Sequence, residues 1–503
     1  MLAVARTFTL VGVAAHEVHV EVDVHSGLAT FSLVGLPDTA VRESRERVRA
    51  ALANCGFDFP LQRITANLAP ADLRKAGPGF DLAIAAALLV ASGQLGSEVL
   101  QRYWLAGELA LDGSIRPVAG VLAMAEEARR QGAAGIAVAA QNAAEAALLD
   151  GLDVVPLRGL GQLVALGEGE LAPLDRSQLA GTGPNGAGPA LADLADLRGQ
   201  PYLRRALEVA AAGGHSLLIV GPPGAGKSLA ARRLPSLLPP LGRGEAIEVT
   251  RIASICGRPP PPGRLAERPF RAPHHTISAA GLVGGGSPPR PGEVTAAHGG
   301  VLFLDELGEF SRQALEALRQ PLEDGRITVT RARHSVDLPC RFMLIAASNP
   351  CPCGRGEGAR DCRCAEASVR RYEAKLSGAL ADRIDISVGV EQPSPEALIK
   401  GPGEPSSAVR ERVIAARERQ ASRLGTGRCN ADMGPAETRR ACRLGDRGVQ
   451  LLARSHTRLG LSGRGYERVL RVARTVADLR ESDLVEIDDL GEALTLRRRG
   501  ALR

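Results

Sequence analysis

Aromatic residues are scarce in this chain. Phe, Trp and Tyr together make up 3% of its 503 residues, and only one of them is Trp. Proteins that bind single-stranded nucleic acid by base stacking place several such rings along one groove. The composition therefore leaves few candidates for that mode of recognition.

Long apolar runs are also missing. No run reaches the roughly 18 residues that a membrane-spanning helix needs, and the N-terminal residues lack a basic segment leading into an apolar run and a cleavage site. We therefore expect a cytoplasmic protein with no membrane partner. In that compartment the nine cysteines are expected to be thiols or metal ligands rather than disulfides.

The charge balance is not extreme. The net charge is +6 and the pI is near 9.0, which permits a polyanionic partner without requiring one. Hydrophobic residues make up 45% of the chain, which supplies ample material for cores, and the length suggests about three domains.

In the N-terminal part, the alternating valines at 18–24 predict a strand and the segment 38–55 predicts a helix with Asp38 as its N-cap. The Ala-rich segment 80–91 predicts a buried helix, and helical spacing at 118–131 predicts another.

One stretch matches the phosphate-binding pattern G-x-x-x-x-G-K-[ST] at every fixed position. An apolar run at 217–220 precedes it and a helical pattern at 229–238 follows it, which distinguishes a phosphate loop from an ordinary Gly/Pro turn. Backbone N–H groups and the helix N-terminus would bind phosphate oxygens. Lys227 would hold the β- and γ-phosphates of ATP, and Ser228 a Mg²⁺ ion. The loop consists of Gly221, Pro222, Pro223, Gly224, Ala225, Gly226, Lys227 and Ser228.

Polar residues end two further apolar runs, at 300–304 and 342–347. Open α/β sheets bind ligands at the carboxyl ends of their strands. There Asp305 would support the Mg²⁺ shell, and Glu306 would orient and polarise the attacking water. Asn349 either contacts the γ-phosphate or that water, or only caps its turn. Farther on, Arg383 either reaches a neighbouring subunit's γ-phosphate or forms a structural ion pair with Asp385.

Four cysteines are gathered in two Cys-x-Cys pairs within a Gly- and Arg-rich segment. Four thiolates suit tetrahedral Zn²⁺, although C-x-x-C is the commoner spacing. The segment therefore predicts either a structural zinc site or free thiols. The four residues are Cys351, Cys353, Cys362 and Cys364.

The alternation at 327–336 predicts a β-hairpin with Arg331 and Arg333 near its tip. Two arginines there suit contact with a nucleic-acid backbone, and a solvated charged hairpin is the alternative. The adjacent pair His274 and His275 suggests packing or polar contact rather than metal ligation.

The order of phosphate loop, Asp-Glu, sensor Asn and Asp-Arg resembles an AAA+ ATPase. The segments Arg268–Ser278, Gly284–Ser287 and Pro291–Glu293 resemble its magnesium-chelatase-like subgroup. An arginine at the start of a C-terminal helix would then reach the γ-phosphate from the same chain. Arg464 is favoured for that role, with Arg468 and Arg471 as alternatives.

The N-terminal part resembles the protease domain of the Lon family. The similarity rests on Lys75–Asp81, Gly107–Leu109, Gly113, Pro117 and Ala119–Gly120. Lon-type proteases carry a serine and a lysine at two positions that correspond here to Gly79 and to the neighbourhood of Met124. Neither residue can act as a nucleophile or its base, so we expect a non-catalytic assembly or substrate-contacting module.

Taken together, the chain resembles the YifB/ComM family over nearly its whole length. The resemblance implies an α/β protein: a Lon-protease-like domain at 1–168, a Gly/Pro-rich linker at 169–190, an AAA+ P-loop parallel-sheet core at 191–395 containing the cysteine cluster at 351–364, and a C-terminal helical lid at 396–503.

The same resemblance implies a homo-hexameric ring that binds ATP and Mg²⁺ at subunit interfaces, with Arg383 acting in trans. ComM members act as DNA branch-migration helicases, so single-stranded or branched DNA and recombination intermediates are the expected partners. A chelatase-type motor that remodels a protein is the alternative. A Lon-like peptidase is the third possibility, against which Gly79 and Met124 argue.

Overall fold

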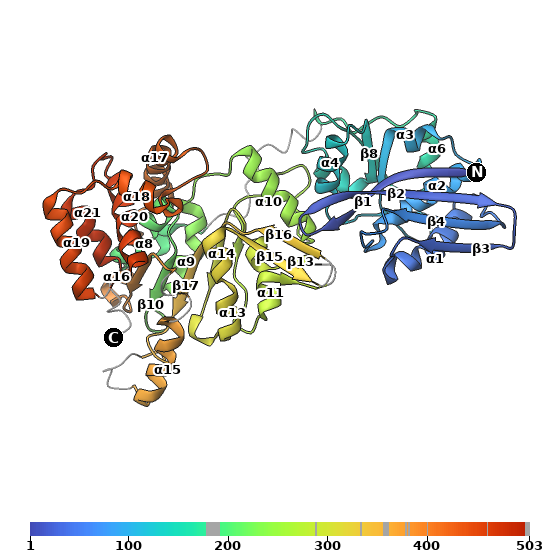
Figure 1. Cartoon of the computed structure of the whole chain (residues 1–503). Helices are drawn as coiled ribbons and strands as arrows, with labels where there is room; N and C mark the ends of the chain where they lie inside the picture. Colours follow the sequence, from blue (N-terminus) through green and yellow to red (C-terminus); the bar gives the residue numbers. More distant parts are fainter. Residues whose placement is uncertain are drawn as a thin grey trace.

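The computed structural model describes residues 1–177, 192–286, 289–331, 334–355, 362–377, 380, 383–399, 401–459 and 461–497. Two large sheets organise them, one in the N-terminal third and one around the phosphate loop (Figure 1). None of the helices within these ranges combines the length and apolar character needed to cross a bilayer.

The N-terminal sheet has seven strands in the order β3-β4-β2-β1-β5-β8-β9. Its long antiparallel pair follows from the period-two pattern predicted around residue 20, because Val18, Val20, Val22 and Val24 all point into the core. The strands are β1 Leu2–Val11, β2 Ala14–His25, β3 Thr30–Val34, β4 Arg63–Ala69, β5 Tyr103–Ala106, β8 Gly135–Ala139 and β9 Asp153–Leu157, with the short pair β6 Glu108–Leu109 and β7 Ile115–Arg116 beside them.

Helices cover this sheet. Asp38 caps α1 by accepting a hydrogen bond from the backbone N–H of Val41, as expected of an N-cap aspartate. The Ala-rich α2 is buried along its whole length, as predicted. The helix expected from residue 118 begins three residues later. The helices are α1 Thr39–Asn54, α2 Asp81–Ala91, α3 Glu98–Arg102, α4 Val121–Arg130, α5 Ala140–Ala146 and α6 Gln162–Gly167.

The second sheet is fully parallel, with five strands in the order β11-β14-β17-β10-β18. Alternate residues of β10 belong to two different apolar clusters, so the sheet is buried on both faces, as parallel sheets usually are. The strands are β10 Leu217–Val220, β11 Phe270–Arg271, β14 Val301–Leu304, β17 Met343–Ser348 and β18 Ile386–Gly389.

C-terminal helices complete the core on one side of this sheet. Helices α17 and α20 pack against α8, and α17 also packs against α9, the helix that follows the phosphate loop. The helices concerned are α8 Pro201–Gly213, α9 Lys227–Leu237, α16 Pro395–Ile399, α17 Ser406–Leu424, α18 Pro435–Ala441, α19 Asp446–Leu459, α20 Gly463–Leu479 and α21 Ile487–Thr495.

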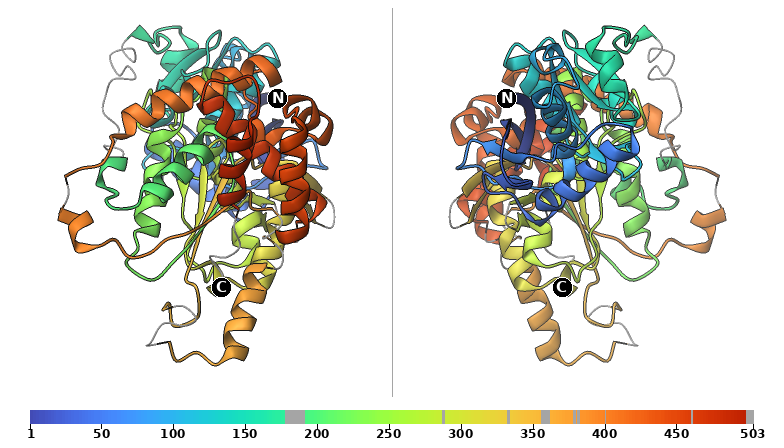
Figure 2. Two further views of the ribbon diagram at one scale, coloured as in Figure 1. Left: turned by 90° about the vertical axis from the view of Figure 1, so that its left-hand side faces the viewer. Right: turned by 90° about the vertical axis from the view of Figure 1, so that its right-hand side faces the viewer.

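The chain between β10 and β18 also carries several smaller elements. The predicted hairpin is present as β15 Arg326–Arg331 and β16 His334–Pro339. Figure 2 shows α15 Glu366–Ser377 extending away from the neighbouring helices, beyond the cysteine segment. The others are α10 Arg243–Ile255, α11 Ala279–Val283, β12 Gly284–Gly285, β13 Arg290–Pro291, α12 Glu293–Ala296, α13 Arg312–Ala317 and α14 Arg319–Asp324.

Within the described residues, the N-terminal part contacts the nucleotide-binding part along α10 and at the β15–β16 hairpin. Between α4 and α10, the backbone N–H of Gly120 donates to Ser254 Oγ at 2.9 Å, and Arg251 pairs with Glu126 at 2.6 Å. In the turn between β1 and β2, Val13 joins the apolar cluster of the β15–β16 hairpin. Gly12 lies so close to the hairpin that a β-carbon there would be 2.3 Å from Val336 Cγ1.

The segment after α6 stays with the N-terminal part up to residue 176. Leu171 and Leu174 pack against its apolar clusters, and Arg176 pairs with Asp150 at 3.0 Å. The predicted linker at 169–190 therefore starts within packed chain, and from residue 178 it lies outside the described residues.

Candidate nucleotide site

The phosphate loop connects strand β10 to α9, as predicted. Gly226 caps the helix with φ +85°, a left-handed conformation that favours glycine. Lys227 then begins α9, and its ammonium donates to the backbone oxygens of Gly221 at 2.5 Å and Pro222 at 3.0 Å. The lysine thus lies folded over its own loop, where phosphate oxygens would compete for the same N–H donors.

Lys227 also joins the loop to the third predicted strand. Its Nζ donates to Oδ1 of Asn349 at 3.0 Å, directly after β17. Burial lowers the pKa of Lys227, although the charges of Asp305 and Glu306 oppose that shift. An ammonium in this setting gains from an additional anion, which is the role a nucleotide phosphate would fill.

The two carboxylates after β14 differ in their surroundings. Asp305 accepts a hydrogen bond from Ser228 Oγ at 2.7 Å, and its other oxygen accepts from the backbone N–H of Glu306 at 3.0 Å. A hydroxyl and a carboxylate this close are the oxygen ligands that Mg²⁺ takes. Glu306 has a left-handed backbone with φ +52° and an exposed side chain. The residues predicted at the carboxyl ends of three separate strands therefore lie close together.

A residue of the insert reaches Glu306. His275 Nδ1 lies 3.3 Å from Glu306 Oε2, and its ring lies near that of Phe310. The His274 ring lies beside it, tilted by 34° with centroids 4.1 Å apart, while His274 Nδ1 is 2.9 Å from Thr276 Oγ1. Polar contact was the expected role of this histidine pair, but its contact with Glu306 was not foreseen.

Arg383 and Arg464 meet at one acidic side chain. Arg383 donates to Glu323 Oε1 at 2.6 Å, and Arg464 donates to the same oxygen at 3.1 Å. Glu323 lies in α14, about 60 residues before Arg383 and 141 before Arg464. Hydrogen bonds therefore place Arg464 and Arg383 together at Glu323. A separate set of hydrogen bonds joins residues at the phosphate loop, namely Lys227, Ser228, Asp305 and Asn349.

Asp385 takes a different partner from the one considered in the sequence. Arg468 pairs with it at 3.0 Å, and Ser216 donates to it through its backbone N–H and its hydroxyl. Burial raises the pKa of Asp385, but His215, Arg468 and Ser216 outweigh that effect and lower it to about 2. Arg471, the other alternative to Arg464, donates to the backbone oxygen of Ala431 at 3.0 Å.

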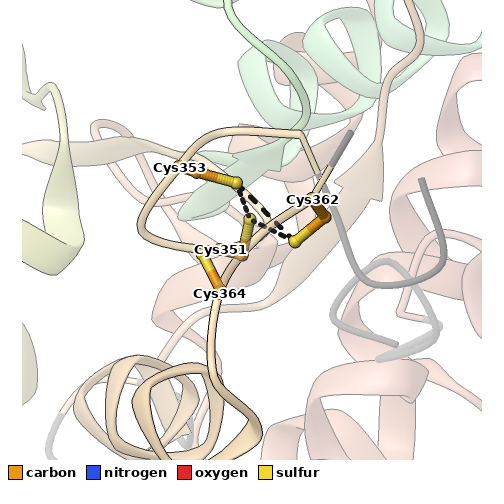
Figure 3. A group of neighbouring side chains, drawn as sticks. All are labelled: Cys351, Cys353, Cys362 and Cys364. Carbon is orange, nitrogen blue, oxygen red and sulfur yellow. Dashed lines mark hydrogen bonds between the residues drawn. The ribbon is translucent and has the colours of Figure 1, made fainter. Parts of the chain in front are cut away.

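The four clustered cysteines converge on one point (Figure 3). Sγ of Cys351 lies 3.3 Å from that of Cys353 and 3.9 Å from that of Cys362, and Cys353 and Cys362 are 3.6 Å apart. All four sulfur atoms, Cys364 included, lie within 4.8 Å of one another. The Arg355 backbone N–H and the neighbouring thiols lower the pKa of Cys353 to about 6, which favours its thiolate.

The remaining predicted residues lie outside these groups. Arg331 ends β15, and its side chain and Arg333 fall outside the described part of the chain. In the N-terminal part, Gly79 faces the side chain of Val118, and Met124 is buried in α4. Both positions therefore have apolar neighbours.

Three family models match: "Magnesium chelatase, subunit ChlI" at residues 193–398, "Subunit ChlI of Mg-chelatase" at 20–142, and "Magnesium chelatase, subunit ChlI C-terminal" at 403–497. The chain is 44% identical to the uncharacterized protein YifB of Salmonella typhimurium, covering 99% of this chain and 97% of the relative. It is 42% identical to the competence protein ComM of Haemophilus influenzae, with the same two coverages.

A more distant similarity extends to Lon protease 2 of Bacillus subtilis. The identity is 29%, over 39% of this chain and 40% of that relative.

Proposed function

This chain belongs to the YifB/ComM family of magnesium-chelatase-like proteins, and we propose on that premise that it is an ATP-hydrolysing AAA+ motor that works as a hexameric DNA branch-migration helicase on recombination intermediates. The observation that carries the ATPase proposal is the convergence of Lys227, Ser228, Asp305 and Asn349 through direct hydrogen bonds. These contacts join the carboxyl ends of three neighbouring parallel strands.

The residues present fit ATP and Mg²⁺. Lys227 and the loop N–H groups would hold the β- and γ-phosphates, and Ser228 and Asp305 would hold the ion. The bound ion would neutralise charge that develops on the transferred phosphoryl group. Glu306, at the exposed end of the same strand, would orient the attacking water and accept its proton. Asn349 would position the γ-phosphate or that water.

Arg383 and Arg464 support the proposal of a site shared between subunits. Both lie at Glu323 rather than at Lys227, so they would serve a nucleotide bound by a neighbouring chain. The in-cis role predicted for Arg464 then becomes a role in trans, beside Arg383. A closed ring of identical subunits gives every nucleotide one such arginine pair, and six is the number of subunits that the family resemblance implies.

DNA is the proposed substrate for two reasons. One full-length relative is named a competence protein, and the sequence that connects β15 to β16 contains Arg333, two residues after Arg331, the last residue of β15. Two arginines in such a connection suit contact with phosphates of either a single strand or a branched duplex. We propose Zn²⁺ in the cysteine cluster as a further, structural ion beside ATP and Mg²⁺.

The test is ATPase activity of the full chain with and without branched DNA, with Lys227→Ala as the inactive control. We expect DNA to raise the turnover rate of the wild-type chain. A chain that hydrolyses ATP but neither binds DNA nor responds to it would instead support the chelatase-type alternative, in which the motor remodels a protein.

A further inference from the structure

The cysteine cluster has the geometry of a closed four-sulfur metal site. Four sulfurs bound to Zn²⁺ at 2.3 Å lie at the corners of a tetrahedron with edges of about 3.8 Å. The three measured separations of 3.3, 3.6 and 3.9 Å are close to that edge. Cys351 is fully buried and Cys362 and Cys364 are half-buried. Four thiolates leave no open coordination position, which is typical of structural rather than catalytic zinc.

The first Cys-x-Cys pair lies directly against the nucleotide site. Cys351 follows Asn349 by two residues, and the backbone N–H of Gly354 closes a turn on the backbone oxygen of Cys351 at 2.9 Å. Gly354 has φ +84°, and a β-carbon there would lie 2.9 Å from the Pro223 ring. The turn that carries two of the sulfurs therefore packs on the phosphate loop.

The second pair leads into α15, which returns to the same site. Tyr372 of this helix is buried, and its hydroxyl lies 3.1 Å from Ser348 Oγ, next to Asn349. The Tyr372 ring also covers Gly308, where a β-carbon would be 2.3 Å from Cε2. Gly308 lies two residues after Glu306. The first Cys-x-Cys pair thus belongs to the turn that packs on the phosphate loop. The second pair leads into the helix that packs beside Ser348 and Gly308.

We propose that the four cysteines bind one Zn²⁺ and that this ion sets the rate of ATP hydrolysis by fixing Asn349 and the segment after Glu306. This inference rests on the proposed ATPase function and adds to it an ion on which the rate of hydrolysis depends. Without the ion, the turn at 351–354 and α15 are held by their own hydrogen bonds and by side-chain packing, and the two Cys-x-Cys pairs are no longer tied to each other. The groups that position water and γ-phosphate then lose their fixed places, whereas Lys227 and Ser228 keep theirs in the first turn of α9.

The prediction is therefore a fall in kcat with little change in KM. A displacement of about 1 Å in a positioning group costs up to about 100-fold in rate, so we expect kcat to fall at least about tenfold. ATP affinity depends mainly on the phosphate loop and should stay within about threefold of wild type.

The first experiment measures metal content of the purified full chain. We expect about one zinc per chain, since four thiolates complete one tetrahedral site. Cys353→Ser and Cys364→Ser should each lose the ion, while Cys55→Ser, a half-buried cysteine in the N-terminal part, should keep it. A wild-type chain without zinc would overturn the proposal.

The second experiment removes zinc from the wild-type chain with a chelator and restores it, with Mg²⁺ held in excess. We expect kcat to fall and then recover. Gly354→Ala leaves all four thiols in place but disturbs the contact with Pro223, so it should retain zinc and still lower kcat. Zinc-free protein with wild-type kcat would show that the ion has no influence on hydrolysis and would overturn the coupling.

Hydrogen exchange gives a readout that does not depend on activity. Removal of zinc should speed exchange in peptides covering 343–354 and 366–377, and leave those covering 221–228 and those of β1 and β2 unchanged. Unchanged exchange at 343–354 would contradict the proposal even if the chain showed no ATPase activity. A chain that gives the expected results in these tests but neither binds DNA nor responds to it would contradict only the proposed helicase function.

Discussion

His275 Nδ1 lies 3.3 Å from Glu306 Oε2. The contact joins the insert after β11 to the residue proposed to orient the attacking water. Glu306 needs such a partner, because its side chain is exposed and its backbone is left-handed. The imidazole therefore fixes the direction of a carboxylate that would otherwise sample several rotamers.

The first prediction concerns this contact. A partly exposed polar contact of this kind is worth up to about 1 kcal/mol, so His275→Ala should lower kcat about two- to fivefold and leave KM nearly unchanged. His275→Gln keeps a hydrogen-bond donor and should restore part of the loss. His274→Ala is the matched control, since His274 bonds to Thr276 instead. A rise in kcat for His275→Ala would show that the histidine restrains Glu306 from acting.

The nucleotide site itself gives the second prediction. Lys227→Ala removes the cation that meets the phosphates and should abolish both ATP binding and turnover. Glu306→Gln keeps the size of the side chain and loses the base, so it should bind ATP and fail to hydrolyse it. A fluorescent ATP analogue measures binding, and phosphate release measures turnover. Normal hydrolysis by Glu306→Gln would refute the assigned base.

Mixing inactive subunits tests whether Arg383 acts in trans. Arg383→Ala and Lys227→Ala should each be inactive alone. In an equal mixture, an interface between an intact loop and an intact arginine forms with a probability of about one quarter, so about a quarter of wild-type ATPase should return.

The control mixture pairs Lys227→Ala with Glu306→Gln, two residues of the same chain's site, and should remain inactive. Equal behaviour of the two mixtures would exclude the shared site. Arg464→Ala in place of Arg383→Ala should complement Lys227→Ala in the same way.

The hairpin gives the fourth prediction. Arg331→Ala combined with Arg333→Ala should weaken DNA binding at every sequence and reduce the slope of log affinity against log salt by about two. Basal ATPase should not change, because neither residue belongs to the nucleotide site. Arg312→Ala, on exposed surface of α13, is the control for losing a surface charge. An unchanged salt slope would move the DNA contact elsewhere.

Asp385 gives a prediction about stability and pH. Its pKa falls from 3.8 to about 2 in the folded chain, so the ionised form stabilises the fold above pH 4. That contribution is lost as the pH falls through the range between these two values. At neutral pH, Asp385→Asn leaves Arg468 without its buried partner and should cost about 3 kcal/mol.

Thermal unfolding at pH 7 and near pH 3 checks this prediction. The difference between Asp385→Asn and wild type should shrink at the lower pH, because Asp385 of the unfolded wild-type chain is then largely protonated and must lose that proton on folding. Asp483→Asn, a substitution at an exposed carboxylate, should show little difference at either pH. A constant difference at the two pH values would contradict the assigned pKa.

Local patterns accounted for much of the nucleotide site. The phosphate loop and the Asp-Glu pair are contiguous in the chain, and the rule for carboxyl ends of parallel strands placed Asn349 beside them. The hydrogen bonds of Lys227 and Ser228 confirm that these strand ends meet. The alternating pattern of β2 and the buried α2 were foreseen for the same reason, since each depends on neighbours in sequence.

Partners from distant segments could not be foreseen. The chain has 56 Asp and Glu residues, and nothing local selects Glu323 as the partner of Arg383 and Arg464. Asp385 stands two residues from Arg383, yet it pairs with Arg468, because β18 carries it under α20. Likewise Tyr372 lies far from Gly308 in sequence. Such pairings depend on how whole elements pack.

The close packing of Gly12 on Val336 has a mechanical consequence. No methyl group fits between them, and Val13 shares the hairpin's apolar cluster, so the hairpin cannot shift alone without exposing that cluster to water. From this turn β1 and β2 run for 10 and 12 residues through the N-terminal sheet. A displacement of the hairpin would therefore displace that sheet with it, so the proposed motor would have to move the N-terminal part as well.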